Sequence, residues 1–149
     1  RYMSLLGNFI KLLLEGGVPY NRHTKFGDAT TFSINPSYLI NNFKVFANFS
    51  SGFKAPTLYQ LFGLYGANPN LKPERSVSNE VGASWIAANN KLEMRVVAFQ
   101  RNIEDVIVYL FPINQNLDNQ RDKGFEADIT YKPSGRLSFK GFYAFVEGN

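Results

Sequence analysis

Apolar and polar side chains alternate along much of the chain. Between Phe43 and Phe53 the odd-numbered positions are mostly apolar and the even-numbered positions mostly polar. Because successive side chains of a strand point to opposite faces, this period predicts strands with one apolar face. Further strands are expected at Asn8–Pro19, Thr30–Ile40 and Val77–Ala87, and from Leu92, Phe125 and Leu137. The pattern therefore predicts an all-β fold, an antiparallel up-and-down meander of about seven strands, most of them long enough (about ten residues) to cross a bilayer.

The connections between these strands alternate in length. Tight turns rich in Asn, Pro, Ser and Gly are expected at Ile40–Asn42, Ala88–Asn90 and Pro133–Gly135. Long connections are expected at Tyr20–Ala29, Lys54–Arg75 and Phe111–Gln120. Short turns on one rim and long loops on the other are typical of outer-membrane barrels. Pro36 lies inside a predicted strand, and since proline cannot donate to a ladder, we expect a bulge or an unpaired position there.

Charged residues of the predicted strands lie opposite the apolar positions. They are Glu93, Arg95, Glu126, Asp128 and Lys140. A membrane barrel places such residues in a polar lumen and its apolar side chains in lipid. A soluble β-sandwich or lipocalin-like barrel also alternates, so this class stays open on the pattern alone. The long strands and the regular loop asymmetry favour the membrane barrel.

Composition narrows the class of protein further. Hydrophobic residues make up 44% of the chain and charged residues 19%, which argues against disorder. The net charge of +4 comes from scattered bases, so no nucleic-acid partner is expected. No apolar stretch reaches the roughly 20 residues of a membrane helix. The start at Arg1 lacks the features of a signal peptide, so a mature or trimmed chain is expected.

Catalytic chemistry is not expected. His23 is the only histidine, lies in a predicted long loop and is expected to be solvent-exposed, and the chain has no cysteine. Glu104 and Asp105 are adjacent, and adjacent side chains on a strand point apart. No zinc-protease, serine-hydrolase or phosphate-loop motif occurs. The sequence therefore predicts neither an enzyme nor a metal site nor a cofactor.

Two motifs flank the longest predicted loop. The first is SGFKAPTLYQL, from Ser51 to Leu61, and the second is NPNLKPERS, from Asn68 to Ser76. They resemble the TonB-dependent outer-membrane receptor family, in which a strand ends in Gly-aromatic-basic-Ala-Pro and the chain returns through Asn-Pro-x-Leu-x-Pro-Glu. The matching residues are Gly52, Phe53, Ala55, Pro56, Asn68, Pro69, Leu71, Pro73 and Glu74. Arg101–Ile107 and Asn119–Ala127 add to the resemblance, which covers about residues 26–149.

The resemblance implies a barrel of about 22 strands around a plug, in the outer membrane of a Gram-negative bacterium. The parent receptor is expected to import a scarce metal-organic nutrient with energy passed from the TonB complex through the plug. Gly63–Pro69 is most similar to vitamin B12 (cobalamin) receptors, and iron-siderophore and haem receptors are the other classes. The alternative function is a soluble or surface β-protein that acts as an adhesion or carbohydrate-binding module.

Residues 1–149 are then expected to be an internal partial barrel domain, without the plug and the final strands. An open sheet exposes two unpaired edges, which neither lipid nor water tolerates well. The isolated fragment is therefore expected to oligomerise or to cover its own edges.

The motif itself is expected to be mainly architectural. Pro56, Pro69 and Pro73 fix φ and end strand pairing. Residues 56–62 are expected to form one or two helical turns with Pro56 near the first position. Three aromatic residues of this loop are candidates for ligand contact: Tyr59, Phe62 and Tyr65.

Overall fold

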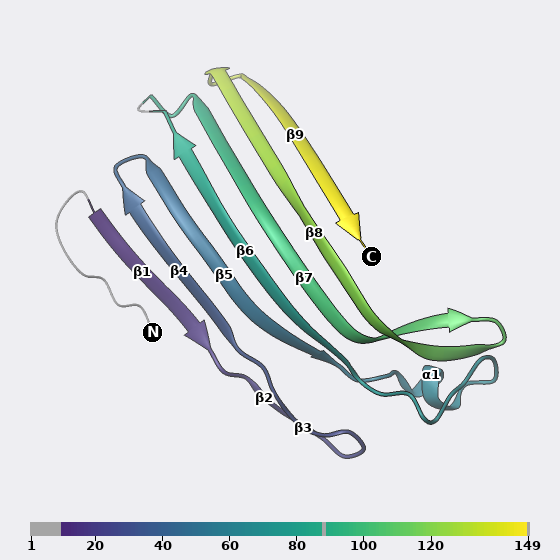
Figure 1. Ribbon diagram of the computed structural model, residues 1–149. Helices are drawn as coiled ribbons and strands as arrows, with labels where there is room; N and C mark the ends of the chain where they lie inside the picture. Colours follow the sequence, from purple (N-terminus) through teal and green to yellow (C-terminus); the bar gives the residue numbers. More distant parts are fainter. Residues whose placement is uncertain (1–9, 88, 149) are drawn as a thin grey trace.

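The computed structural model describes residues 10–87 and 89–148 as an antiparallel sheet with loops at its lower rim (Figure 1). The sheet has seven strands in the order β1-β4-β5-β6-β7-β8-β9. Their bounds are β1 Ile10–Gly17, β4 Ser33–Ile40, β5 Phe43–Lys54, β6 Glu74–Ile86, β7 Leu92–Leu110, β8 Ile113–Ser134 and β9 Leu137–Gly148. A separate hairpin joins β2 (Tyr20–His23) to β3 (Gly27–Thr30), and α1 spans Leu58–Phe62. The predicted all-β meander is confirmed.

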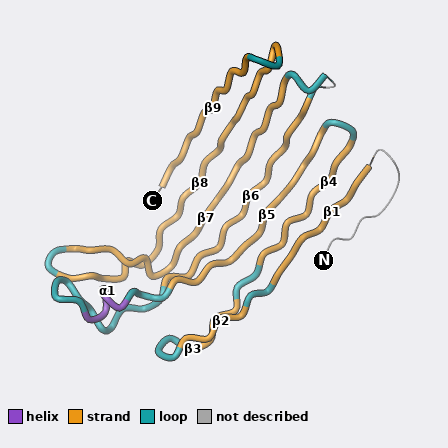
Figure 2. The backbone as a smooth tube through the Cα atoms, turned by 180° about the vertical axis from the view of Figure 1, so that it is seen from behind, coloured by secondary structure: helices purple, strands orange, loops and turns teal. Residues whose placement is uncertain are grey.

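Figure 2 shows how little of the chain is helical. Within the described ranges, no helix has both the length and the apolar character that a membrane-crossing helix needs. β5 to β9 have at least 12 residues each, whereas a tilted strand needs about 9–11 to cross a bilayer.

Two of the predicted long connections are wrong in extent. Phe111–Gln120 is not a loop, because β7 and β8 continue past the sheet and only Phe111 and Pro112 separate them. The polar residues of this segment form a strand because the partner strand supplies the ladder, and pairing outweighs weak β-propensity. Tyr20–Ala29 likewise contains most of the β2–β3 hairpin, so the strand expected from Thr30 begins at Ser33.

The remaining turns follow the sequence. Asn41 and Asn90 have positive φ values of 50° and 55°, a conformation that asparagine tolerates well. Pairing between β4 and β5 skips Asn35 and Pro36, although Pro36 still faces Leu14 of β1. The expectation of a locally unpaired proline is therefore confirmed on the β5 side. The first predicted strand began at Asn8, and residues 8 and 9 lie outside the described ranges, as does Ala88 of the second short turn.

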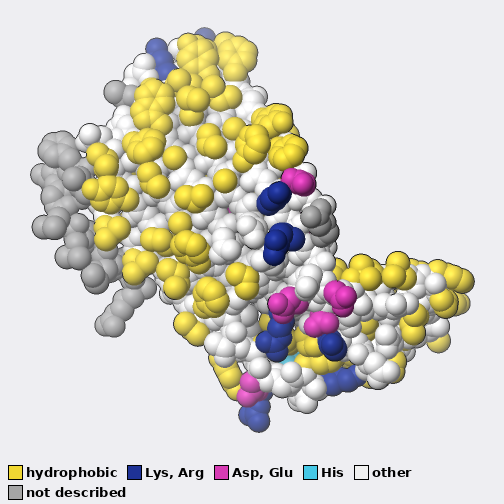
Figure 3. All heavy atoms as spheres, in the orientation of Figure 1, with side chains coloured by type: hydrophobic (Ala, Val, Ile, Leu, Met, Phe, Trp, Pro, Cys, Tyr) yellow, Lys and Arg dark blue, Asp and Glu magenta, His cyan; other side chains and the backbone are white. Residues whose placement is uncertain are grey.

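The strand register gives the sheet one apolar face. One cross-strand row on this face contains Val45, Ala83, Val96, Ala127 and Tyr143. Figure 3 shows apolar side chains spread over the sheet on the side viewed in Figure 1. Most of these side chains are exposed, and the buried hydrophobic residues of the described chain are only Ala29, Leu61, Leu71 and Val97. Within the described ranges, no second layer covers this face.

The apolar face is bounded on both sides. Towards the long loops, a polar row follows on the same face and contains Asn79, Gln100, Lys123 and Glu147. Towards the short turns, exposed aromatic residues gather, among them Phe43, Trp85, Tyr131 and Phe139. Aromatic belts of this kind flank the lipid-facing band of outer-membrane barrels. We call the surface between these two borders the apolar band.

Candidate functional site

The five charged residues singled out from the sequence share the face opposite the apolar band. Arg95 faces Asp128 across β7 and β8, with Nη1 3.6 Å from Oδ2. Thr130 lies between Glu93 on β7 and Lys140 on β9. Glu126 faces Val97. We call this surface the polar face; whether it lines a transport lumen stays a prediction.

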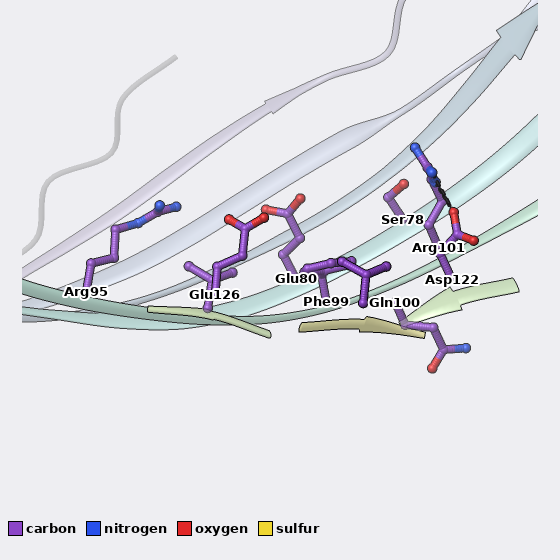
Figure 4. Close-up of a pocket in the computed structure, with 10 residues that line it drawn as sticks. Ser78, Glu80, Arg95, Phe99, Gln100, Arg101, Asp122 and Glu126 are labelled. Atoms are coloured by element: carbon purple, nitrogen blue, oxygen red, sulfur yellow. Dashed lines mark hydrogen bonds and ion pairs between the residues drawn. The ribbon is translucent and has the colours of Figure 1, made fainter. Parts of the chain in front are cut away.

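A depression of about 470 Å³ lies on the polar face (Figure 4). Arg95, Glu126, Glu80 and Arg101 rise from the same side of the sheet, and Gln100 points to the other side. The Arg101 Nε donates to Asp122 Oδ2 at 3.1 Å. Two ion pairs on the polar face, Arg95–Asp128 and Arg101–Asp122, thus join β7 to β8.

Some polar groups near the depression lack such partners. Among the described residues, neither Glu80 nor Glu126 forms an ion pair. Outside the depression, the buried Oδ1 atoms of Asn35 on β4 and Asn48 on β5 accept no hydrogen bond from the described residues. The two carboxylates without an ion pair leave acceptors open in the depression, which suits a polar or hydrated occupant. Glu80 lies on the polar side of β6 and borders the same depression as Glu126.

The first motif ends β5 and begins the helical turn. Gly52 pairs with Ser76, and a Cβ at Gly52 would lie 2.5 Å from the Ser76 hydroxyl oxygen. The Phe53 ring lies 5.9 Å from the guanidinium carbon of Arg75. Ala55 is half-buried. The strand therefore ends in a position where a larger residue than glycine does not fit without a shift of Ser76.

Helix α1 is held by a capping box, and Pro56 is not inside it. Thr57 is the N-cap; Gln60 N–H donates to its hydroxyl at 3.2 Å, and Thr57 N–H donates to the Gln60 side chain at 2.9 Å. The helical turn expected over residues 56–62 begins at Leu58, and Pro56, expected near its first position, is a buried residue directly before the cap. A threonine can accept from the first turn whereas proline has no such side chain, so Thr57 takes the cap.

The second motif shapes the return of the loop. The Asn68 carbonyl accepts from Leu71 N–H at 3.3 Å and its side chain accepts from Asn70 N–H at 3.0 Å. Leu71 is buried with 3% of its surface exposed. Pro73 is half-buried, and Glu74 begins β6. These contacts support the architectural interpretation of the motif.

Glu74 joins three parts of the chain. Its Oε1 accepts from Lys54 Nζ at 2.9 Å on β5 and from Ile107 N–H at 3.0 Å on β7. The carboxylate is largely buried, with 13% of the side chain exposed. The sequence places Glu74 in the motif but does not indicate this partner, since Ile107 lies 33 positions away.

The three aromatic candidates lie on the long-loop rim. Tyr59, Phe62 and Tyr65 are exposed by 61%, 62% and 76%. Lys25, on the turn between β2 and β3, lies 4.9 Å from the centroid of the Phe62 ring and donates to the Pro69 carbonyl at 3.0 Å. Two loops that are far apart in sequence thus meet at Phe62 and Pro69.

The β2–β3 hairpin has its own polar contacts. His23 is half-buried rather than exposed as expected, because its Nδ1 accepts from the backbone N–H groups of Lys25 and Phe26 at 3.3 and 3.4 Å. A hydrogen bond to Asp28 raises the pKa of Tyr20. In the described part of the chain, no group of three or more His, Cys, Asp or Glu residues is placed to hold a metal ion. The two hydrogen bonds that His23 accepts stabilise the turn between β2 and β3.

Known proteins are similar to this chain in sequence or in fold. A family model described as TonB dependent receptor-like, beta-barrel, matches residues 3–149. The vitamin B12 transporter BtuB of Photobacterium profundum is 33% identical over 109 residues, which are 72% of this chain and 18% of that protein. The siderophore receptor PirA from Pseudomonas aeruginosa has a TM-score of 0.83 and 24% identity, over 96% of this chain and 29% of that chain. The copper transporter OprC has a TM-score of 0.66 and 17% identity, over 96% of this chain and 26% of that chain.

The chain spans less than a third of each of these relatives. The relatives are named as transporters or receptors rather than enzymes. The family model, however, covers nearly the whole chain, including both motifs and all strands of the sheet. The chain therefore belongs to the family of TonB-dependent receptor-like β-barrels.

Proposed function

We propose that this chain is a wall segment of an outer-membrane receptor that imports a scarce metal-organic nutrient into a Gram-negative bacterium. The observation that carries the proposal is the two-faced sheet. Its apolar band has the borders of a lipid-facing surface, and its other face holds ion pairs, unpaired carboxylates and a depression. A bilayer on one side and a polar path on the other account for both faces. An exposed apolar surface of this extent is not typical of a soluble adhesion module.

In this proposal the 149 residues form one partial barrel domain. The seven strands contribute to a wall of about 22 strands, and the polar face, with Glu93, Arg95, Glu126, Asp128 and Lys140, lines the path. Energy comes from the TonB complex through a plug elsewhere in the parent protein, as family membership implies. Transport breaks no covalent bond, so neither catalytic residues nor a cofactor are needed.

Cobalamin is the first candidate nutrient. The motif spacing at Gly63–Pro69 and the curated relative, a vitamin B12 transporter, both favour it. Iron-siderophore complexes are the second candidate, because the structure with a TM-score of 0.83 is a siderophore receptor. Exposed Tyr59, Phe62 and Tyr65 supply flat apolar surfaces for a large ring-bearing ligand.

Nutrient-limited growth tests the function. A strain without the full-length gene should fail to grow when cobalamin is limiting, and the intact gene should restore growth. If the strain fails to grow only when iron chelates are the iron source, the substrate is a siderophore complex rather than cobalamin. Normal growth in both media, together with loss of binding to surface glycans, would favour the adhesion alternative.

The aromatic candidates are tested in the same strain. Alanine replacements of Tyr59, Phe62 and Tyr65 should weaken binding of the nutrient to whole cells, whereas Leu58→Ala, on the same short helix as Tyr59 and Phe62, should not. Leu58 is a matched control because it is 78% exposed but carries no ring. Unchanged binding in all three aromatic variants would remove them from the proposed site.

The isolated fragment provides a separate test of the fold. We propose that it associates or covers its own edges in solution, because the outer sides of β1 and β9 have no strand partner in the described sheet. Light scattering without detergent should show oligomers. A monodisperse monomer with a fully exposed apolar band would contradict this proposal.

A further inference from the structure

β7 leaves the sheet at Asp105. This residue has a φ of 54° and is skipped by the pairing of β7 with β8, which resumes at Val106. The ladder between β6 and β7 ends at the Arg75–Glu104 pair. Beyond this point the hairpin formed by residues 105–119, which we call the hairpin arm, bends away from the sheet (Figure 1). The bend deprives backbone groups of β7 of strand partners on the β6 side.

Side chains from outside β7 supply hydrogen-bond partners for these backbone groups. Glu74 accepts from the Ile107 N–H at 3.0 Å. Asn116 Nδ2 donates to the Asp105 carbonyl at 2.6 Å. The two contacts fix the backbone at the bend and two residues beyond it. Since an unpaired buried backbone group is costly, these two side chains hold the arm at this angle.

Asn116 also binds the loop that carries the family motif, residues 55–73, which we call the docked loop. Its Oδ1 accepts from Lys72 N–H at 2.8 Å, and its Nδ2 donates to the Lys72 carbonyl at 3.0 Å. One amide group thereby replaces a strand residue opposite Lys72, since it offers a donor and an acceptor side by side. The docked loop is thus attached to the arm by a pair of hydrogen bonds like that between two paired strand residues.

A second contact lies nearer the tip of the arm. Asn114 is buried, its N–H donates to the Gly66 carbonyl at 2.8 Å, and its own carbonyl accepts from Asn68 Nδ2 at 2.9 Å. Gly66 has a φ of 64°, and a Cβ there would collide with the ring of Tyr109. The arm therefore fits closely against the docked loop at two separate points.

The geometry points to a latch: Asn116, supported by Asn114 and Glu74, couples the docked loop and the hairpin arm so that they move as one body. Asn116 is a positioning residue, because it acts on the loop backbone and not on a ligand. The inference extends the proposed function, since the docked loop carries Tyr59 and Tyr65 and the latch fixes where they lie relative to the arm. It does not depend on the identity of the nutrient.

The coupling is measured in the full-length receptor by the distance between two spin labels. Leu64 on the docked loop and Phe111 on the arm are 92% and 88% exposed, so labels at these sites disturb few contacts. The receptor with an intact latch should give a single narrow distance distribution. Asn116→Asp should broaden it at least twofold, because the second carboxylate oxygen replaces Nδ2 and faces the carbonyl oxygens of Lys72 and Asp105.

Gln115→Glu is the matched control. It makes the same amide-to-carboxylate change one position away, at an exposed side chain, and should leave the distribution narrow. A broad distribution in the intact receptor, or an equally narrow one in Asn116→Asp, would overturn the latch.

A second measurement needs no variant and covers the case in which Asn116→Asp does not fold. Hydrogen exchange should show equal protection of residues 66–74 and 105–116 in the intact receptor, and rapid exchange of one segment alone would also overturn the latch. Nutrient-dependent growth of the same strain reports on the proposed import separately, so that one idea can fail while the other stands.

Discussion

The aromatic ring of Phe46 on β5 covers Gly82, its cross-strand partner on β6. A Cβ at Gly82 would also lie 2.9 Å from the Val96 carbonyl oxygen on β7. The guanidinium carbon of Arg95 lies 5.4 Å from the centre of the Phe46 ring. Phe99 and Gly124 repeat the arrangement between β7 and β8. An aromatic side chain that covers a strand glycine keeps the polar face packed where glycine offers no side chain.

Gly82→Ala should therefore destabilise the receptor. The added methyl group has no room between the Phe46 ring and the β7 backbone, and overpacking of this kind costs about 1–3 kcal/mol. The measurement is the midpoint of thermal unfolding. Gly135→Ala is the control, because no atom lies within 4 Å of a Cβ at that turn. Equal midpoints for the two variants would show that the ring moves aside freely.

A charge in the apolar band should impair folding into a bilayer. Val96 lies within the band and Gln100 lies in its polar border, on the same strand and the same face. Arginine on a lipid-facing strand costs about 2–4 kcal/mol at mid-membrane and about 0–1 near the interface. Val96→Arg should thus lower stability in a urea titration of the receptor folded in vesicles. If Gln100→Arg is as damaging as Val96→Arg, the band is not the membrane-facing surface.

The Arg101–Asp122 pair should matter more than the Lys123–Glu147 pair on the other face. Asp122 has 10% of its side chain exposed, whereas Lys123 and Glu147 are exposed by 60% and 53%. Removing one partner leaves a poorly solvated charge in the first case, whereas solvent screens the second pair. Arg101→Gln should lower the midpoint of urea unfolding more than Lys123→Gln. The reverse order would show that solvent already screens Asp122.

The backbone conformation at Asp105 should restrict which residue is accepted there. Its φ of 54° lies in a region that glycine and asparagine enter easily and β-branched residues avoid. Asp105→Gly and Asp105→Val both lose the pair with Lys72, in which Nζ lies 3.6 Å from Oδ1. The valine variant should nevertheless be less stable than the glycine variant by about 1–2 kcal/mol. Equal thermal midpoints would mean that the bend relaxes.

The sequence was sufficient to predict those features that depend on a single strand, motif or turn. Alternation assigned Arg95 and Val96 to opposite faces, and the register shows them there. The family motif could be identified from Asn68 to Glu74 because its residues are consecutive and its prolines limit the backbone locally. The turn at Asn41 was predictable because asparagine tolerates the positive φ that the turn needs.

The extent of β7 and β8 was not predictable, because pairing with a neighbour decides whether polar residues such as Asn114 and Asn116 form a strand or a loop. Their partners on the docked loop lie 44–48 positions earlier in the chain.

By itself, the sequence determined that the strands have two faces, which face is apolar, and the family of the motif. These features depend on side-chain direction and on turn chemistry within a few residues. Only the tertiary structure decided that Glu80 borders the same depression as Glu126, and that Glu74 and Asn116 hold the bend at Asp105. The physical reason is that a hydrogen bond or an ion pair requires two groups at contact distance, and the register of strands far apart in the sequence sets that distance.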